Sequence, residues 1–244
     1  MTDFATRLTA AERNQNSPNV RPKDAATLIL VDRAGKAPRV LMGRRNPSLK
    51  FMPNMFVFPG GRLEKFDKAM PVYGIVDPDS ERRLMQSVQR PTLGRVRGLA
   101  AAAIREMYEE TGLMVGTKDL GAPEAPCDDW RAFESHEVFP NLEALTFVAR
   151  AITPPRRPRR FDTRFFVADA GAVCDEEPGK VGENSELVDL KWLTFDETKA
   201  EDLPTVTRVV LEELAARIEA GFHHRLPVPS YAMRHGQFVR TLLD

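Results

Sequence analysis

Residues 105–114 read Arg-Glu-Met-Tyr-Glu-Glu-Thr-Gly-Leu-Met, and this stretch decides how the chain folds. On a helix of ~3.6 residues per turn, Glu106 and Glu110 lie ~40° apart around the axis, and Glu109 lies ~60° from Glu106 on its other flank. Apolar side chains such as Ile104 point elsewhere, towards a core. Like charges at these spacings destabilise a helix by ~0.2–0.5 kcal/mol per pair. Three converging carboxylates therefore indicate a site for a hard divalent cation, which prefers oxygen ligands.

An ordinary solvated acidic face is the alternative interpretation of the same helix. In that case Arg105 and Glu109 would form an i,i+4 ion pair, and Gly112 would end the helix. Both interpretations predict the helix, but only the first predicts metal ligands. The rest of the sequence pattern must decide between a metal site and a solvated acidic face.

The complete string over residues 105–113, Arg-Glu-apolar-any-Glu-Glu-any-Gly-apolar, resembles the second half of the Nudix box. The first half is present in altered form, since Phe58-Pro59-Gly60-Gly61 follows an apolar run. Asp67 stands where the family has Glu, and 37 positions instead of seven separate it from Arg105, which is an insertion of 30 residues. The chain therefore resembles the Nudix hydrolase family with an enlarged box.

The insertion occupies about residues 68–97. It begins with an acidic, proline-containing stretch, and a short helix is expected near Ser80–Val88. The carboxylate helix is expected over residues 95–111. Because the insertion lies in the loop before that helix, the geometry of the three glutamates can survive it. The placement of the glycine loop against the helix is less constrained.

The remaining pattern predicts an α/β fold. We expect strands over Ala25–Val31, Arg39–Met42, Phe56–Phe58, Glu143–Ala151, Phe161–Asp169 and Leu187–Leu193, with Trp192 in the core. A helix opens near Pro204 and closes at Gly221. A mixed sheet with helices on both faces fits this order, and the resemblance implies a Nudix-type α/β/α sandwich. The domain would span 22–200, with a loose arm over 1–21 and an added C-terminal helix and tail over 201–244 packed on it.

The amino-acid composition limits the classes of binding partner that we expect. Lys plus Arg and Asp plus Glu both total 35 in 244 residues, so the formal net charge of zero disfavours a general nucleic-acid or membrane binder. No apolar stretch approaches the ~18 residues of a membrane span. Cys127 and Cys174 form neither a metal-ligand spacing nor a disulfide framework, which favours a cytoplasmic protein. A homodimer is left open.

The resemblance implies roles for the box residues. Glu109 and Glu110 would ligate Mg²⁺, with Mn²⁺ as a substitute, and Glu106 would ligate metal or act as a base on the attacking water. The carbonyl of Gly60 would complete the metal shell, and Arg105 would orient the carboxylates by a salt bridge. Family members often supply one more acid from outside the box. Glu186 is the first candidate and Glu183 the second, with an exposed loop acid as the alternative for both.

A narrower resemblance concerns the substrate. Residues 44–61 and 160–166 are similar to segments of peroxisomal-type coenzyme A diphosphatases, a branch that also carries a long insertion within the box. This implies hydrolysis of coenzyme A or an acyl-coenzyme A, with Arg44, Arg45 and Arg160 in substrate binding. The alternative is that these segments belong to a scaffold shared by the family and say nothing about the substrate. The basic run 156–160 could attract phosphates or be a solvated Pro-Arg loop.

Three functions remain from sequence alone. The first is a metal-dependent hydrolase of a diphosphate linkage in a nucleoside diphosphate derivative. The second is an inactive Nudix-scaffold module that binds a metabolite, motivated by Asp67 and the insertion. The third is an isomerase acting on an isoprenoid diphosphate, which would need a cysteine at the site.

Overall fold

The computed structural model describes residues 3–11 and 16–244, and a mixed β-sheet forms its centre. Within the described residues this sheet has the order β10-β2-β1-β8-β7-β11-β12, with β3 paired to β2 and β4 paired to β1. The pairs β1–β8 and β7–β11 are parallel and the others antiparallel. The strands are β1 (Lys23–Asp32), β2 (Arg39–Arg45), β3 (Phe56–Val57), β4 (Gly60–Arg62), β7 (Thr146–Ile152), β8 (Phe161–Asp169), β10 (Leu187–Thr194), β11 (Val228–Arg234) and β12 (Gln237–Leu243).

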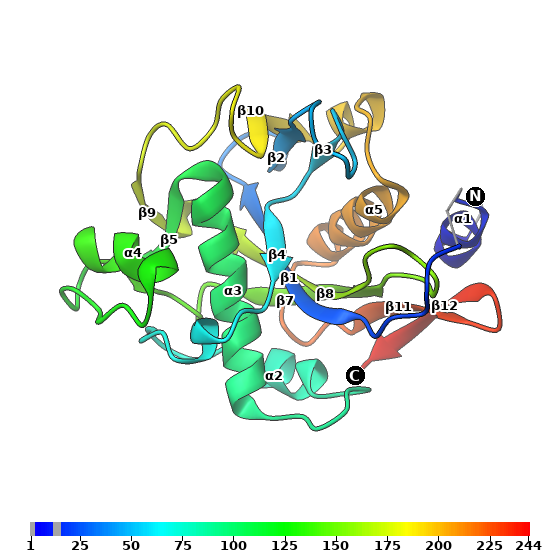
Figure 1. Cartoon of the computed structure of the whole chain (residues 1–244), viewed down its shortest axis with the longest axis horizontal. Coiled ribbons are helices and arrows are strands. Elements are labelled where there is room, and N and C mark those ends of the chain that lie inside the picture. Colours follow the sequence, from blue (N-terminus) through cyan, green and yellow to red (C-terminus); the bar gives the residue numbers. More distant parts are fainter. Residues whose placement is uncertain (1–2, 12–15) are drawn as a thin grey trace.

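Helices cover both faces of this sheet (Figure 1). The central strand β1 is an almost continuous apolar run whose side chains alternate between faces. Ala26, Leu28 and Leu30 pack in the cluster beneath α3 (Leu93–Thr111), whereas Ile29 and Val31 pack in the cluster beneath α5 (Thr205–Glu219). The expected α/β/α sandwich is confirmed.

The carboxylate helix α3 has strong signals at both ends. The side chain of Thr92 caps its N-terminus by accepting a hydrogen bond from the backbone N–H of Arg95, so the helix starts two residues earlier than expected. Gly112 ends it with φ +85, a left-handed conformation that suits glycine. A second sheet lies beside α3, formed by β5 (Leu113–Thr117), β6 (Phe139–Pro140) and β9 (Val173–Glu176). The short helix α4 (Arg131–Ser135) adjoins it.

The box insertion folds as α2 (Pro78–Leu84) and its connections, preceded by a 3₁₀ turn over Phe66–Lys68. Asp77 caps α2. Arg83 is buried and donates hydrogen bonds to the carbonyls of His224 and Arg225. The insertion is thus held against the C-terminal region and away from the glutamates of α3. Other 3₁₀ turns lie at Asp128–Trp130, Ala170–Ala172 and Glu197–Ala200.

The C-terminal region belongs to the main sheet. The helix near Pro204 is α5, as expected, and the tail beyond it forms the hairpin β11–β12, for which the sequence carried no strong signal. Since β11 pairs with β7, the expected boundary at residue 200 falls inside one continuous sheet.

The N-terminal segment differs from the expected loose arm. Residues 4–10 form the helix α1 (Phe4–Ala10), with Leu8 buried in the cluster beneath α5. Arg7 forms a salt bridge to Glu212 at 2.6 Å, and Thr9 accepts a hydrogen bond from the backbone N–H of Phe238. The prediction was wrong there because Phe4 and Leu8, an i,i+4 apolar pair, find a partner surface on α5 and β12. Residues 1–2 and 12–15 lie outside the described part.

Two strand predictions need adjustment. Trp192 is only half-buried on β10, and its neighbour Leu193 is the buried residue, because β10 is an edge strand of the sheet. The strand predicted from Glu143 starts at Thr146.

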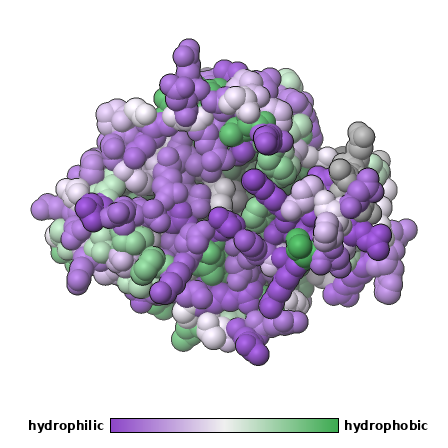
Figure 2. Space-filling view, in the orientation of Figure 1, coloured by the Kyte–Doolittle hydropathy of each residue, from purple (hydrophilic) through white to green (hydrophobic). Residues whose placement is uncertain are grey.

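Hydrophilic residues cover most of the face seen in Figure 2. No helix among the described residues is long and apolar enough to cross a membrane.

Candidate functional site

Two glycines let strand β4 lie close to both the carboxylate helix and strand β1. A Cβ on Gly61 would stand 2.3 Å from the Glu106 carboxylate, and one on Gly60 would stand 2.7 Å from the backbone oxygen of Ala26. The backbone N–H of Gly60 donates to Oε1 of Glu110 at 3.4 Å. The glycine pair therefore brings backbone to the helix glutamates, which is the placement that the insertion had left open.

Arg105 organises the helix acids, as the resemblance implied. Its Nη1 contacts Glu106 and Glu109, each at 2.9 Å. Its other nitrogens donate to Asp67 at 2.8 and 3.2 Å and to the carbonyl of Arg62. The fork geometry of a guanidinium fits this double contact with one carboxylate. Glu106 and Glu109 each give Arg105 one oxygen and keep the other for a further partner.

Asp67 is the buried anchor of this network. It is 1% exposed and accepts hydrogen bonds from the backbone N–H of Glu64 at 2.7 Å and from Nε1 of Trp130 at 3.2 Å. No sequence pattern indicated Trp130, which lies outside the box. The shorter Asp side chain thus still reaches Arg105, so the change from Glu does not disconnect the two halves of the box.

Burial disfavours the charged form of all three helix glutamates. Burial raises the pKa of Glu106 to about 7 although Arg105 opposes the shift, and burial also raises the pKa of Glu109. Burial raises the pKa of Glu110 well above its ordinary value, and the negative charges of Glu186 and Glu106 raise it further. Oε2 of Glu110 is buried without a hydrogen-bond partner. The site therefore holds more negative charge than its own cations neutralise.

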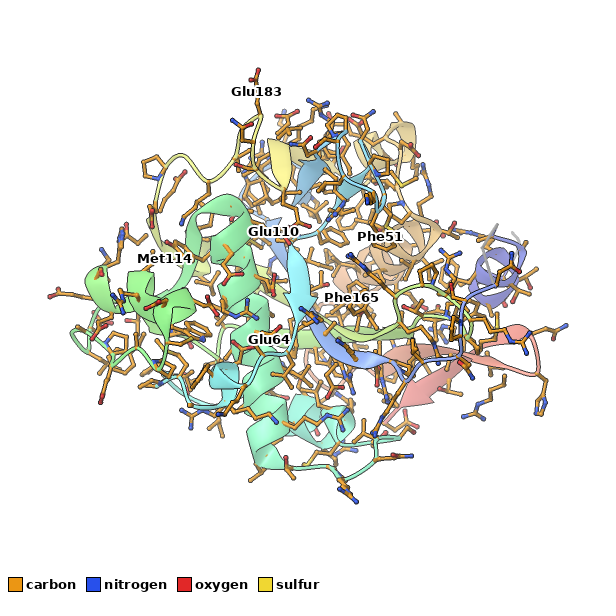
Figure 3. All side chains as sticks on the ribbon, in the orientation of Figure 1. Phe51, Glu64, Glu110, Met114, Phe165 and Glu183 are labelled. Carbon is orange, nitrogen blue, oxygen red and sulfur yellow. The ribbon has the colours of Figure 1, made fainter. Side chains whose placement is uncertain are left out.

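Glu186 faces this cluster from the other side of the cleft. It forms a salt bridge of 2.7 Å to Arg45, and its charge acts on Glu110. The backbone oxygen of Glu186 accepts from the N–H of Asn46, which fixes the loop that carries it. Glu183, the second candidate, is exposed and points away from the cleft at the tip of its loop (Figure 3). Of the two acids outside the box, only Glu186 lines the site.

A cavity of about 450 Å³ lies between these groups. It is lined by the glycines of β4, the box charges and residues that the sequence did not single out. The lining residues are Arg45, Phe51, Gly60, Gly61, Arg62, Glu64, Arg105, Glu106, Glu109, Glu110, Asp129, Arg159, Phe161 and Glu186. A site of this size, bordered by convergent polar groups, fits a small ligand.

The donor set suits a hard cation. Over residues 3–11 and 16–244, no group of three or more Asp, Glu, His or Cys side chains is already arranged to hold an ion. The unpartnered buried oxygen of Glu110 and the raised pKa values nevertheless indicate a missing positive charge. Oxygen ligands of this kind are those that Mg²⁺ prefers.

The predicted substrate arginines separate into two groups. Arg45 lines the cavity. Arg44 instead contacts Asn54 and Asp189, and Arg160 donates to Asn19 and to the carbonyls of Val20 and Thr153. Arg44 and Arg160 thus do not line the cavity, because strand alternation and the N-terminal segment turn them to other partners. Arg159, from the same basic run, lines it.

The fold and this cleft define a class, the Nudix-fold proteins with a carboxylate helix facing a glycine strand. A crystal structure of a NUDIX hydrolase from Alicyclobacillus acidocaldarius matches with a TM-score of 0.58 and 26% identity, covering 81% of this chain and 92% of that one. A Caenorhabditis elegans protein named as a nudix hydrolase is 29% identical over 70% of this chain and 51% of its own length. In sequence and in fold, the chain is thus similar to Nudix hydrolases.

A further relative is an acyl-coenzyme A diphosphatase. The acyl-coenzyme A diphosphatase NUDT19 of Xenopus laevis is 26% identical over 64% of this chain and 52% of its own length. The chain thus spans about half the length of the curated relatives it matches. No family model matches the chain.

Proposed function

We propose that the protein hydrolyses a diphosphate linkage in a nucleoside diphosphate derivative, using a divalent cation, with Mg²⁺ as the natural ion. The observation that carries the proposal is the excess of buried negative charge at the cavity, with Oε2 of Glu110 lacking any partner. Glu106, Glu109 and Glu110, the carbonyl of Gly60 and Glu186 would hold the metal.

When bound, the cation neutralises phosphate charge and lowers the pKa of the attacking water. The residues of this chain supply positioning. Asp67 fixes Arg105, and Arg105 fixes one oxygen of Glu106 and one of Glu109. Glu106 lines the cavity, and where it does not hold the metal its carboxylate can accept a proton from a water there. Arg45 and Arg159 border the same space and can bind the phosphates.

For the substrate we propose coenzyme A or an acyl-coenzyme A. The support is the likeness of segments 44–61 and 160–166 to that branch, together with the NUDT19 relative. Arg45 and Phe51 of the first segment, and Phe161 of the second, line the cavity. These segments therefore lie where a substrate would be recognised.

A substrate panel tests the proposal. Coenzyme A, acyl-coenzyme A, ADP-ribose, NADH and dinucleoside polyphosphates are incubated with Mg²⁺, Mn²⁺ or chelator, and products are separated by chromatography. Cleavage should require the metal and fall about 10²–10³-fold in Glu110→Gln, as expected for loss of a group that stabilises the transition state. Glu124→Gln changes an exposed acid outside the cavity and serves as the matched control. Equal activity of the two variants would refute the site.

The inactive binding module lacks a specific observation in its favour. Its motive was the altered first half of the box, yet Asp67 contacts Arg105 with two oxygens. Calorimetry would reveal such a module as binding of a diphosphate ligand without metal-dependent turnover.

A further inference from the structure

A second, larger cavity adjoins the carboxylate site. Its volume is about 870 Å³, within the ~300–1,000 Å³ range of ligand pockets. Five residues border both cavities and form the boundary between them: Arg45, Phe51, Arg159, Phe161 and Glu186. A ligand can therefore reach from one compartment into the other across this boundary.

Apolar side chains from distant parts of the chain line the larger cavity. Its floor is the α5-facing side of β7 and β8, where Phe165 is 6% exposed. Its walls include Leu8 of α1 and Phe238 of β12. Figure 3 shows Phe51 and Phe165 on the same side of Glu110. The acidic cleft thus opens next to an apolar compartment.

The loop over residues 46–55 forms one wall of the larger cavity. Phe51 is 39% exposed and borders both cavities, while Met52 and Met55 line the larger one. Asn46 anchors the loop base by donating to the carbonyls of Glu183 and Ser185. Methionine side chains are unbranched and fit apolar ligands of varied shape. A loop that is anchored at its base and carries methionines further along suits a flexible hydrocarbon.

Cations also line the larger cavity, and some of them border the carboxylate site. Lys50 and Arg157 line the larger cavity, and Arg159 lines both. An apolar ligand alone would gain nothing from these charges. A ligand with an anionic head and an apolar tail would contact both the cations and the apolar floor.

We propose that the larger cavity binds a long apolar chain carried by the same diphosphate substrate, with the diphosphate lying at the boundary beside Arg45 and Arg159. This inference rests on the proposed function for the identity of the head group. The chain could be the acyl group of an acyl-coenzyme A or an alkyl group joined directly to a diphosphate. Burial of apolar surface would then make affinity increase with chain length until the cavity is filled.

Titration calorimetry without divalent ions tests the inference independently of turnover. Coenzyme A and its acetyl, hexanoyl and dodecanoyl thioesters form one series, and butyl and dodecyl diphosphate form the other. The dissociation constant should fall at least 30-fold from the acetyl to the dodecanoyl thioester. A parallel fall in the alkyl series would indicate direct attachment of the chain, and a fall confined to the thioesters would indicate an acyl-coenzyme A. Equal affinity at all chain lengths in both series would overturn the inference.

A cavity-filling variant locates the chain. Thr163 lies on β8 at the cavity floor, and Thr163→Trp would occupy space there. The preference for dodecanoyl over acetyl thioester should fall at least tenfold. Thr241→Trp, the same change at an exposed position of β12 outside both cavities, should retain the preference. Equal preferences in the two variants would place the chain elsewhere, and circular dichroism checks that both fold.

The two proposals fail in different ways. Chain-length-dependent binding without metal-dependent cleavage would refute the proposed hydrolase and retain the apolar site. Metal-dependent cleavage with a KM and an affinity that do not change with chain length would support the proposed hydrolase and refute the apolar site.

Discussion

Two clusters of buried charge flank strand β1 and helix α3, and they are built on opposite principles. In the first, Arg95 and Arg164 contact Asp24 at 2.5 and 2.9 Å, and Arg164 and Arg150 contact Asp162 at 3.1 and 2.7 Å. Every guanidinium of this cluster faces a carboxylate, and Arg150 also donates to backbone carbonyls at Gln86 and Ser87. The cluster thus places each of its three guanidiniums and two carboxylates beside an opposite charge, although Nε of Arg95 and Nε of Arg164 have no hydrogen-bond partner.

The second cluster does not. Glu106 and Glu110 repel each other and Glu186, and an oxygen of Glu110 has no partner. Arg105 is already engaged by Asp67, and Arg45 by Glu186. Since an uncompensated buried charge destabilises a fold, its retention points to a ligand that completes it. The comparison teaches that partners, more than the number of charges, distinguish a structural cluster from a binding site.

The largest effect is expected from breaking the compensated cluster. Asp162→Asn would leave Arg150 without its carboxylate and Arg164 with only Asp24. Removing one partner of a buried pair costs about 3–5 kcal/mol, so the free energy of unfolding in urea should fall by about 3 kcal/mol. Asp196→Asn, which breaks a fully exposed pair with Lys199, should leave it unchanged within error. A loss below about 1 kcal/mol for Asp162→Asn would contradict this view of the cluster.

A glycine substitution sharpens the view of the acidic cluster. Gly61→Ala places a methyl group 2.3 Å from the Glu106 carboxylate and must displace it. Misplacement of a catalytic group by about 1 Å can cost ~10²-fold, so activity should fall between about 10- and 100-fold. Gly94→Ala, in the first turn of α3 with nothing within 4 Å of the new methyl group, is the matched control. Similar activity of both variants would show that Glu106 tolerates displacement.

Local patterns predicted most of this fold. The apolar run of β1, the end of α3 at Gly112 and the start of α5 near Pro204 each follow from near-neighbour chemistry. The hairpin β11–β12 and the helix α1 were missed, because their stability comes from packing against β7 and α5. Contacts of that kind connect residues more than two hundred positions apart, as between Arg7 and Glu212, and leave no periodic signal.

The site was predicted unevenly for the same reason. Spacing along one helix identified Arg105 and the three glutamates, and the structure brings all four to one cavity. Asp129 and Arg159 line the cavity from a 3₁₀ turn and a loop that lie outside the box in sequence, and Trp130 of the same turn as Asp129 contacts Asp67. Arg159, and not Arg160, lines the cavity. Because adjacent side chains near a strand point in opposite directions, this alternation was the available sequence signal for Arg159.

The pH dependence of stability should have opposite signs for the two clusters. Burial alone would raise the pKa of Asp24, but Arg95 and Arg164 outweigh it and hold the pKa below its ordinary value. The stabilisation it provides is present above pH ~4 and is lost as the pH falls. Glu106, with its pKa raised from 4.5 to about 7, instead destabilises the metal-free protein as the pH rises through that window.

Chelator-treated protein allows the two signs to be measured. Between pH 4.5 and 7 the free energy of unfolding should fall by about 2 kcal/mol on account of Glu106. Glu106→Gln should reduce this slope to the part that comes from Glu109 and Glu110, whose pKa values are also raised by burial, whereas Asp24→Asn should flatten only the loss below pH 4. A metal-free protein whose stability rises steadily from pH 4.5 to 7 would argue that the acidic cluster is compensated after all.

The smallest effect separates two arginines that the sequence grouped together. Arg45 borders both cavities and holds Glu186, so Arg45→Gln should raise the KM for the cleaved substrate about 10-fold, which corresponds to about 1.4 kcal/mol of binding. Arg160 is engaged by Asn19 and the carbonyls of Val20 and Thr153. Arg160→Gln should therefore change the KM less than about twofold and instead lower the melting temperature, since it loosens the N-terminal segment. Steady-state kinetics and thermal unfolding of both variants provide the check. A KM that rises equally in the two would return Arg160 to the substrate-binding role that its sequence position suggested.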